Sequence, residues 1–405
     1  MRTAVKITSV ILIIALAACC YFFLPEDLTS HGIEASQFPE LTKYEEGTGI
    51  LRDSLGYYEK ILYDAVLEGL KNYDEQVVVR IKNYTSEQVS EVLQDVILDH
   101  PEIFWADLSG FYYMTGDMGV KVTLAYSVAE SDLDSRKQSF DEALNELVAA
   151  ADGSETPYEK VLAVHDALLQ SCEYDLTTSE DDIHNAYGAL VNRLAVCDGY
   201  ADAMKCALDK LGIECRIIAG DALNGKGESV GHAWCEVKIG GAYTFIDPTW
   251  DDMDSAGGQR AIASSAAVSH RYFGLSTAEI ALDHTSQQDM SGSAAIPEGF
   301  SMSWYQHTGS EGSSIDDIAE CAAQQLFDNL TEGKSWFEVR ITDSDEYSTL
   351  YKDEGFYEII DIANEKLSAS GSTDSFSYSA RFYLLSDELG CILCVCSLEG
   401  VDLAA

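Results

Sequence analysis

Apolar positions follow helical and strand periods in turn, and they divide the chain into folded parts. Between residues 57 and 73 apolar side chains recur every three or four positions, which predicts a helix. A strand at 76–81 and a second helix at 86–99 follow, and strand signals return at 111–116 and 120–128. This order predicts a small α+β unit.

The last hundred residues repeat this order of elements. They contain two predicted helices (315–330 and 357–367) and three predicted strands (336–341, 377–385 and 391–396). In both units a helix precedes a strand that ends in Val-Arg-Ile, at 79–81 and 339–341. The repeat suggests an internal duplication, although three shared residues are thin support. The strand at 391–396 holds three cysteines whose alternation favours a buried strand over a metal site.

The middle of the chain has a richer pattern. It predicts two helices at 132–151 and 157–170, a segment at 186–193, a helix that starts at Cys197, a strand from Cys215, and two strands around Gly240-Gly241. We therefore expect an α+β fold in five parts. These are a targeting segment (1–25), a tether (26–55), an N-terminal unit (56–130), a central domain (131–290) and a C-terminal unit (300–405).

The N-terminus has the features of a targeting segment. Arg2 and Lys6 precede an apolar run from residue 7 to residue 24. Leu-Ala-Ala-Cys at 16–19 resembles a bacterial lipoprotein cleavage site, in which Cys19 would carry the lipid. The run is also close to the ~18 residues that span a bilayer, so a membrane anchor is the alternative, and a cleaved, secreted product is the third. In the first two cases the body is extracytoplasmic and tethered to the membrane.

Composition narrows the classes of function. The 405 residues carry 69 acidic and 25 basic side chains, for a formal charge of −44. Such a surface repels phosphate backbones and excludes nucleic acid as a partner. The glycine-rich stretch 220–227 is not a phosphate loop, because Gly227 stands in place of the Ser or Thr and a strand follows instead of a helix. No cofactor and no metal site are predicted.

Three residues in the central domain have the order that nucleophilic acyl chemistry needs. Cys197 is placed at a helix N-terminus, where the helix dipole favours a thiolate. His232 lies on a predicted strand and can take the thiol proton, and Asp247 can orient the imidazole. Gly199 in the first turn indicates close approach of substrate or of a neighbouring part of the chain.

The hairpin around Gly240-Gly241 gives a geometric argument for this pairing. With a two-residue turn, Trp234 faces Asp247, and His232 shares the face of Trp234. Diagonal neighbours in such a ribbon lie roughly 7–8 Å apart at Cα, within reach of an imidazole and a carboxylate. A three-residue turn would place His232 and Asp247 on opposite faces of the hairpin.

The segments around these residues resemble the transglutaminase-like superfamily of cysteine enzymes. The resemblance rests on residues 186–220, on GHAWCEV and on FIDPTW, and covers about 155–290. It implies a papain-like core in which a Cys-bearing helix packs on an antiparallel sheet. It also implies Cys197 as nucleophile, His232 as base and acid, and Asp247 as its orienter. Tyr187 becomes a candidate for the oxyanion site, with packing as its alternative, and Trp234 and Trp250 are expected to line the site.

The sequence therefore predicts a membrane-tethered, extracytoplasmic enzyme that forms a thioester with a peptide or protein amide. Attack by an amine or by water would resolve the thioester, and we favour water. A second thiol, Cys235, follows the HAW motif where many relatives carry a polar residue. The alternative is a catalytically inactive binding or scaffold protein on the same fold. Substrate identity and oligomeric state stay open.

Overall fold

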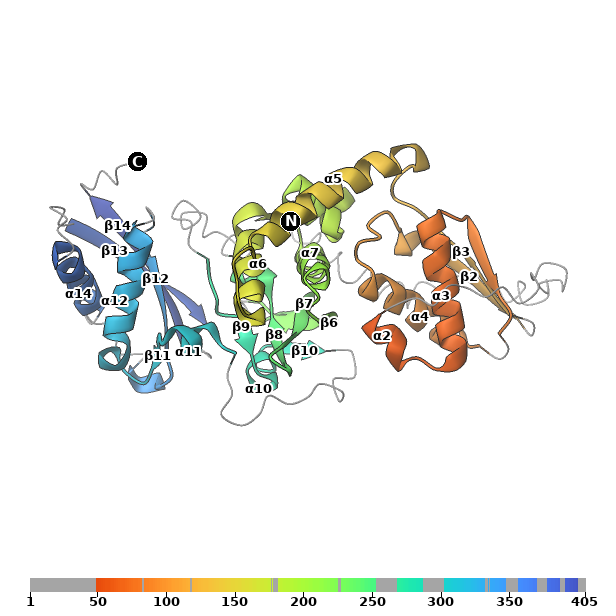
Figure 1. The fold of residues 1–405 in the computed structure, drawn as a ribbon. Helices are drawn as coiled ribbons and strands as arrows, with labels where there is room; N and C mark the ends of the chain where they lie inside the picture. The colour runs from red at the N-terminus through yellow and green to blue at the C-terminus, as the bar shows by residue number, and fades with distance from the viewer. Residues whose placement is uncertain are drawn as a thin grey trace, which may run out of the picture. The chain divides into compact units, whose positions relative to one another are not determined.

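The computed structural model describes residues 49–81, 84–116, 119–175, 177, 181–224, 227–252, 268–286, 302–331, 334, 336–346, 356–369, 377–386 and 390–399. The fold is α+β with antiparallel sheets, as the sequence predicted (Figure 1). The chain forms two compact units. One comprises residues 1–150, 180–235 and 286–288, and the other comprises 151–179, 236–285 and 289–405. The division falls inside strand β7 (Ser229–Ile239), after Cys235.

The first unit opens with a three-stranded antiparallel sheet and two helices. The helices α3 (Tyr57–Asn72) and α4 (Ser86–Asp99) match the predicted ranges closely. Thr85 accepts from the Gln88 N–H and so caps α4. The strands β1 (Gln76–Val79), β2 (Tyr112–Gly116) and β3 (Gly119–Thr123) lie in the order β1-β3-β2. The third strand ends at Thr123 and is shorter than predicted, although the Leu124 N–H still donates to the carbonyl of Glu75 in the same register.

The same unit holds the helix that begins at Cys197. This helix, α7 (Cys197–Lys210), packs on α5 (Glu130–Ala149) and on strand β6 (Cys215–Leu223). Before it, the segment predicted at 186–193 forms a π-helix, η5 (Gly188–Asn192). Arg193 ends η5 in the left-handed region, at φ 58°.

The second unit contains the predicted hairpin turn. Gly240 and Gly241 both have positive φ, at 61° and 91°, between the end of β7 and the start of β8 (Ala242–Ile246). Two left-handed residues in sequence are typical of a type I′ turn, which glycine accepts without strain. The prediction of a two-residue turn is therefore confirmed. The strand β8 pairs with β9 (Phe273–Leu275), and helix α6 (Pro157–Ser171) contacts α8 (Pro248–Asp251).

The C-terminal part of the second unit is a sheet covered by two helices. Its strands are β11 (Glu311–Gly312), β12 (Trp336–Ile341), β13 (Ser377–Ser386) and β14 (Cys391–Glu399), in the order β11-β12-β14-β13. The helices α12 (Ile315–Thr331) and α14 (Phe356–Ala369) bury their apolar faces against it (Figure 1). The cysteine-bearing segment from residue 391 forms a strand, as predicted, and this strand lies between β12 and β13.

The N-terminal part with strands β1 to β3 and the C-terminal part with strands β12 to β14 share one topology. Each runs helix, strand, helix, strand, strand, and in each sheet the third of these strands lies between the first and the second. This common order supports the internal duplication that the repeated Val-Arg-Ile suggested.

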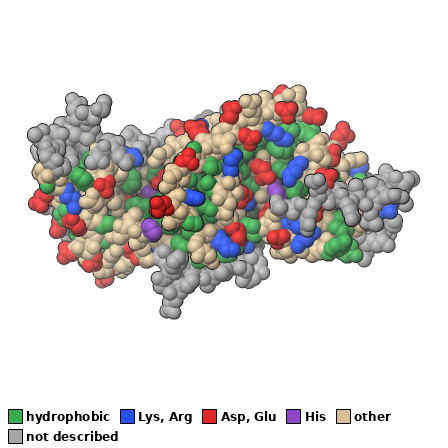
Figure 2. Space-filling model, viewed as in Figure 1, with side chains coloured by type: hydrophobic (Ala, Val, Ile, Leu, Met, Phe, Trp, Pro, Cys, Tyr) green, Lys and Arg blue, Asp and Glu red, His purple; other side chains and the backbone are tan. Residues whose placement is uncertain are grey.

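Within the described residues, no helix has both the length and the apolar character needed to span a bilayer. The predicted targeting segment (1–25), including Cys19, lies outside the described residues. Acidic side chains are spread over the visible face of the molecule, with basic ones between them (Figure 2), as the strong negative charge requires.

Candidate active site

Cys197 is the first residue of α7. The preceding Val196 has an extended backbone, and no side chain caps the helix there. The thiol is free, and the residue is 5% exposed. The unsatisfied N–H groups at a helix start favour a negative charge. Cys197 therefore lies at the helix start, where the sequence predicted it.

Gly199 is required by the packing of the chain against the start of α7. A Cβ at this position would lie 2.7 Å from the carbonyl oxygen of Ile183 and 3.0 Å from that of Asn185. The Val196 N–H also donates to Ile183, at 3.0 Å. Of the two explanations for Gly199, the close approach of a neighbouring segment is the one that the structure shows.

His232 and Trp234 lie on β7, and both are buried. Their rings are 6.1 Å apart and tilted by 22°, so they share a face, as the alternation predicted. Cys235 lies on the other face, and its thiol is 3.7 Å from the carbonyl oxygen of Ala201 in α7. The strand that carries His232 thus packs against the helix that carries Cys197. The second thiol of the HAW motif belongs to this packing.

Tyr187 precedes η5 and is held by ring contacts. Its ring lies 4.8 Å from the ring of Phe104, and the guanidinium of Arg136 lies 3.9 Å from its centre. These contacts explain the burial of Tyr187 as packing. Its role at an oxyanion stays a prediction.

Asp247 is fully buried and caps helix α8. Its Oδ1 accepts from the backbone N–H groups of Thr249, at 3.0 Å, and Trp250, at 3.2 Å. The residue follows the end of β8, so its position is set by the start of α8. The hairpin pattern predicts that Asp247 lies on a strand of the hairpin, opposite Trp234. The capping of α8 by Asp247 could not be predicted from this pattern, because Asp-Pro also occurs in simple turns.

His284 is a residue that the sequence argument missed. Its Nε2 lies 3.2 Å from Asp247 Oδ2, and its Nδ1 lies 2.6 Å from Asp283 Oδ1. Burial works against protonation, but the hydrogen bonds with Asp247 and Asp283 outweigh it and raise the pKa of His284. The ring of Trp250 packs on this imidazole at 4.7 Å. No local motif marks His284, because its partner is distant in sequence.

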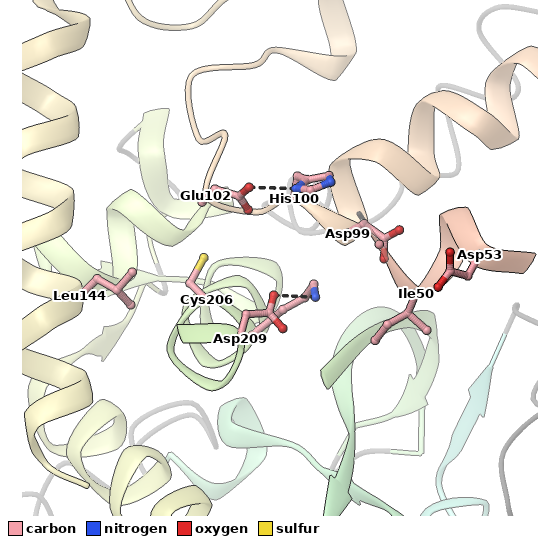
Figure 3. A pocket seen from close by; sticks show the side chains of 10 residues that line it. Ile50, Asp53, Asp99, His100, Glu102, Leu144, Cys206 and Asp209 are labelled. Carbon is pink, nitrogen blue, oxygen red and sulfur yellow. Dashed lines mark hydrogen bonds and ion pairs between the residues drawn. The ribbon is translucent and has the colours of Figure 1, made fainter. Parts of the chain in front are cut away.

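The first unit also contains a cavity of about 480 Å³, which none of the residues described above lines (Figure 3). Four of its ionisable groups form two pairs, His100 with Glu102 and Lys205 with Asp209, both at 2.8 Å. Burial and nearby carboxylates raise the pKa of the Cys206 thiol well above its usual range. None of the residues predicted to act in catalysis lines this cavity, and its thiol is a poor nucleophile.

Comparison with known proteins gives one family match, to the transglutaminase-like superfamily over residues 145–248. This segment contains Cys197, His232 and Asp247. A search of curated proteins gives no match.

Solved structures show distant likenesses only. A putative cysteine protease from Cytophaga hutchinsonii is 16% identical, with a TM-score of 0.24, over 34% of this chain and 61% of its own. A structure described as a TGase is 13% identical, with a TM-score of 0.25, over 43% and 50%. The periplasmic domain of TgpA from Pseudomonas aeruginosa bound to ethylmercury is 18% identical, with a TM-score of 0.23, over 38% and 68%. The chain thus spans about half to two-thirds of these proteins, and these likenesses carry no argument about function.

The family match (145–248) overlaps the segment whose sequence resembles this superfamily (about 155–290). Over residues 145–248 the chain is similar to the transglutaminase-like superfamily.

Proposed function

We propose that this protein is a cysteine-dependent enzyme that acts on peptide or protein amides through Cys197, His232 and Asp247. The observation that carries the proposal is the free thiol of Cys197 as the first residue of α7, inside the family match. The buried His232 on β7, inside the same family match, supports it. So does the buried, fully oriented carboxylate of Asp247.

The first half of the reaction forms a thioester. His232 takes the proton of the Cys197 thiol, and the sulfur attacks the amide carbonyl carbon. As the tetrahedral intermediate collapses, the C–N bond breaks and His232 gives the proton to the leaving amine. In the second half, His232 takes a proton from water, the oxygen attacks the thioester, and the thiolate leaves. Attack by an amine instead of water would give transfer, and we favour hydrolysis.

Asp247 acts on this reaction by orienting His232. Its Oδ1 is held by two backbone N–H groups, and its Oδ2 faces the imidazole of His284. Each carboxylate oxygen has two acceptor sites, so these contacts leave capacity for a further donor. A carboxylate fixed in this way can hold an imidazole in one tautomer and stabilise the imidazolium that forms.

We also propose that the protein is exported and stays tethered to the membrane through residues 1–25. Arg2, Lys6 and the apolar run to residue 24 support this, and Cys19 is the candidate lipidation site.

The reaction is tested by incubating the detergent-solubilised protein with glutamine-containing peptides and a labelled primary amine. We expect deamidated or cleaved peptides by mass spectrometry, with little incorporated amine. The Cys197→Ala variant should give no product. Products that persist in this variant contradict the proposal, and a folded wild type that forms none favours the inactive binding protein.

The role of Asp247 is tested by two substitutions that separate charge from capping. Asp247→Asn keeps a side-chain oxygen for the cap, so the free energy of unfolding should change by less than about 1 kcal/mol. Its kcat should fall by about 10²-fold or more, because the orientation of His232 is lost. Asp247→Ala should lose activity and, in addition, about 1 kcal/mol of stability.

Thr85→Ala provides the matched control, since it removes the cap of α4. This variant should lose comparable stability in urea unfolding while its kcat stays unchanged. Full kcat in Asp247→Asn would exclude Asp247 from the mechanism.

The tether is tested by fractionating cells and by labelling with a fatty-acid analogue. Membrane association with label that is lost in Cys19→Ser indicates a lipoprotein. Membrane association without label indicates an apolar anchor. Recovery of the protein in the medium contradicts tethering.

A further inference from the structure

A second cluster of ionisable side chains lies in the second unit, on helix α6 and beside β9. His165 and Asp166 are neighbours on α6, and His270 lies three residues before Phe273, the first residue of β9. His165 Nδ1 is 2.9 Å from Asp166 Oδ1, and His270 Nε2 is 3.1 Å from the same oxygen. The three residues offer ligand atoms that all lie within 4.8 Å of one another. Both imidazoles are buried, with 0% and 2% exposure.

The other nitrogen of each imidazole faces a buried carboxylate of its own. His165 Nε2 lies 3.3 Å from Asp251 Oδ2, and His270 Nδ1 lies 3.0 Å from Glu338 Oε2. Asp251 and Glu338 are themselves fully buried. Each histidine therefore has an inner nitrogen close to Asp166 and an outer nitrogen close to a second carboxylate. The outer nitrogen of His270 is hydrogen-bonded to Glu338, whereas His165 Nε2 and Asp251 Oδ2 lie at ion-pair distance without hydrogen-bond geometry.

These outer carboxylates are fixed by further hydrogen bonds. Asp251 Oδ1 accepts from the Ser269 hydroxyl at 3.2 Å and from the Tyr272 N–H at 2.9 Å. Glu338 accepts hydrogen bonds from the Tyr305 hydroxyl and from the backbone N–H of His270. Trp304 stacks on the imidazole of His270, with 4.2 Å between ring centres and a 5° tilt. Hydrogen bonds and ring packing around both imidazoles thus fix their orientation.

This arrangement matches the surroundings of a protein metal centre. Histidines that bind metals donate the N–H of the second nitrogen to a carboxylate, which turns the lone pair of the first toward the ion. Here, a proton on His270 Nδ1, bonded to Glu338, and one on His165 Nε2, beside Asp251, would leave two lone pairs and one carboxylate oxygen facing each other. Three acceptors in contact repel unless a cation lies between them.

We propose that His165, Asp166 and His270 bind a divalent transition-metal ion of the Zn²⁺ class. Two imidazoles and one carboxylate are a common ligand set for such ions, with water as the fourth ligand. Bonds of about 2.0–2.1 Å in a tetrahedron place ligand atoms about 3.3 Å apart. The distances of 2.9 and 3.1 Å are close to this spacing. The Asp166 side chain is 32% exposed, which leaves the centre a side open to water.

The ion would connect three parts of the second unit. His165 and Asp166 come from α6, Asp251 ends α8, and Glu338 lies on β12 of the C-terminal sheet. A structural role follows, because the ion would join α6 to the segment before β9, and His270 in turn is bonded to Glu338 of the C-terminal sheet. The proposal does not depend on the activity proposed above.

The alternative occupant of this cluster is a pair of protons. An imidazolium at each histidine would also satisfy the three inner acceptors, and two protons carry the same charge as one divalent ion. The experiment therefore has to separate a metal centre from a network of imidazolium and carboxylate groups.

Metal content tests the proposal directly. The full chain in a Cys197→Ala background, which removes the thiol as a zinc ligand, is stripped with a chelator, given Zn²⁺ and dialysed. Elemental analysis should find about one zinc per chain. The near-isosteric Asp166→Asn and the His270→Gln variants should retain at least fivefold less. His184→Asn is the matched control, because it removes a histidine paired with an aspartate elsewhere (Asp198, at 2.9 Å), and it should bind as the parent does.

X-ray absorption of the zinc-loaded parent gives a result that does not depend on the folding of any variant. We expect only nitrogen and oxygen ligands, with two imidazoles. A parent that retains no zinc after dialysis overturns the proposal in favour of the imidazolium network. Sulfur in the coordination shell, or equal zinc in Asp166→Asn and the parent when both are folded, overturns it as well.

Discussion

The buried carboxylate of Asp247 is the constraint on which the proposed site depends. A fully buried charge is costly unless hydrogen bonds compensate for it. Asp247 meets this need with two backbone N–H groups at the start of α8 and the imidazole of His284. These bonds fix the point at which the chain leaves β8, and with it the direction of the carboxylate. The same carboxylate thus stabilises the local fold and, in the proposed mechanism, orients His232.

The short helix α8 has a buried carboxylate at each end. Asp247 caps its start and faces His284, while Asp251 at its end faces His165. A four-residue helix has little stability of its own. Its position is set by these polar contacts and by the packing of Trp250 on Tyr272 and His284. The cluster around His165 and His270 therefore contributes to the placement of Asp247, whether it holds protons or a metal ion.

Much of the fold could be predicted because local patterns determine it. Helices α3 and α4 have amphipathic spacing and clear ends, and their observed bounds agree with the prediction to within a residue. The Gly240-Gly241 turn was predictable because two consecutive glycines suit a turn with positive φ. The start of α7 at Cys197 followed from its apolar face.

The remainder depends on contacts between distant residues. The cap formed by Asp247, the partner of His284 and the partners of His165 and His270 are set by tertiary packing. His270 and Glu338 belong to different parts of the chain, and no periodicity relates them. Local sequence patterns accordingly indicate neither a metal site nor the partners of these histidines.

The central claim is that His232 activates the thiol of Cys197, and the rate of thiol alkylation tests it most directly. The measurement is the rate constant for modification of Cys197 by a fluorogenic alkylating reagent near neutral pH, in the wild type and in His232→Ala. The account predicts rapid modification of Cys197 in the wild type and a decrease of at least about tenfold in the variant, because the thiolate is the reactive form. Equal rates in the two proteins would contradict it.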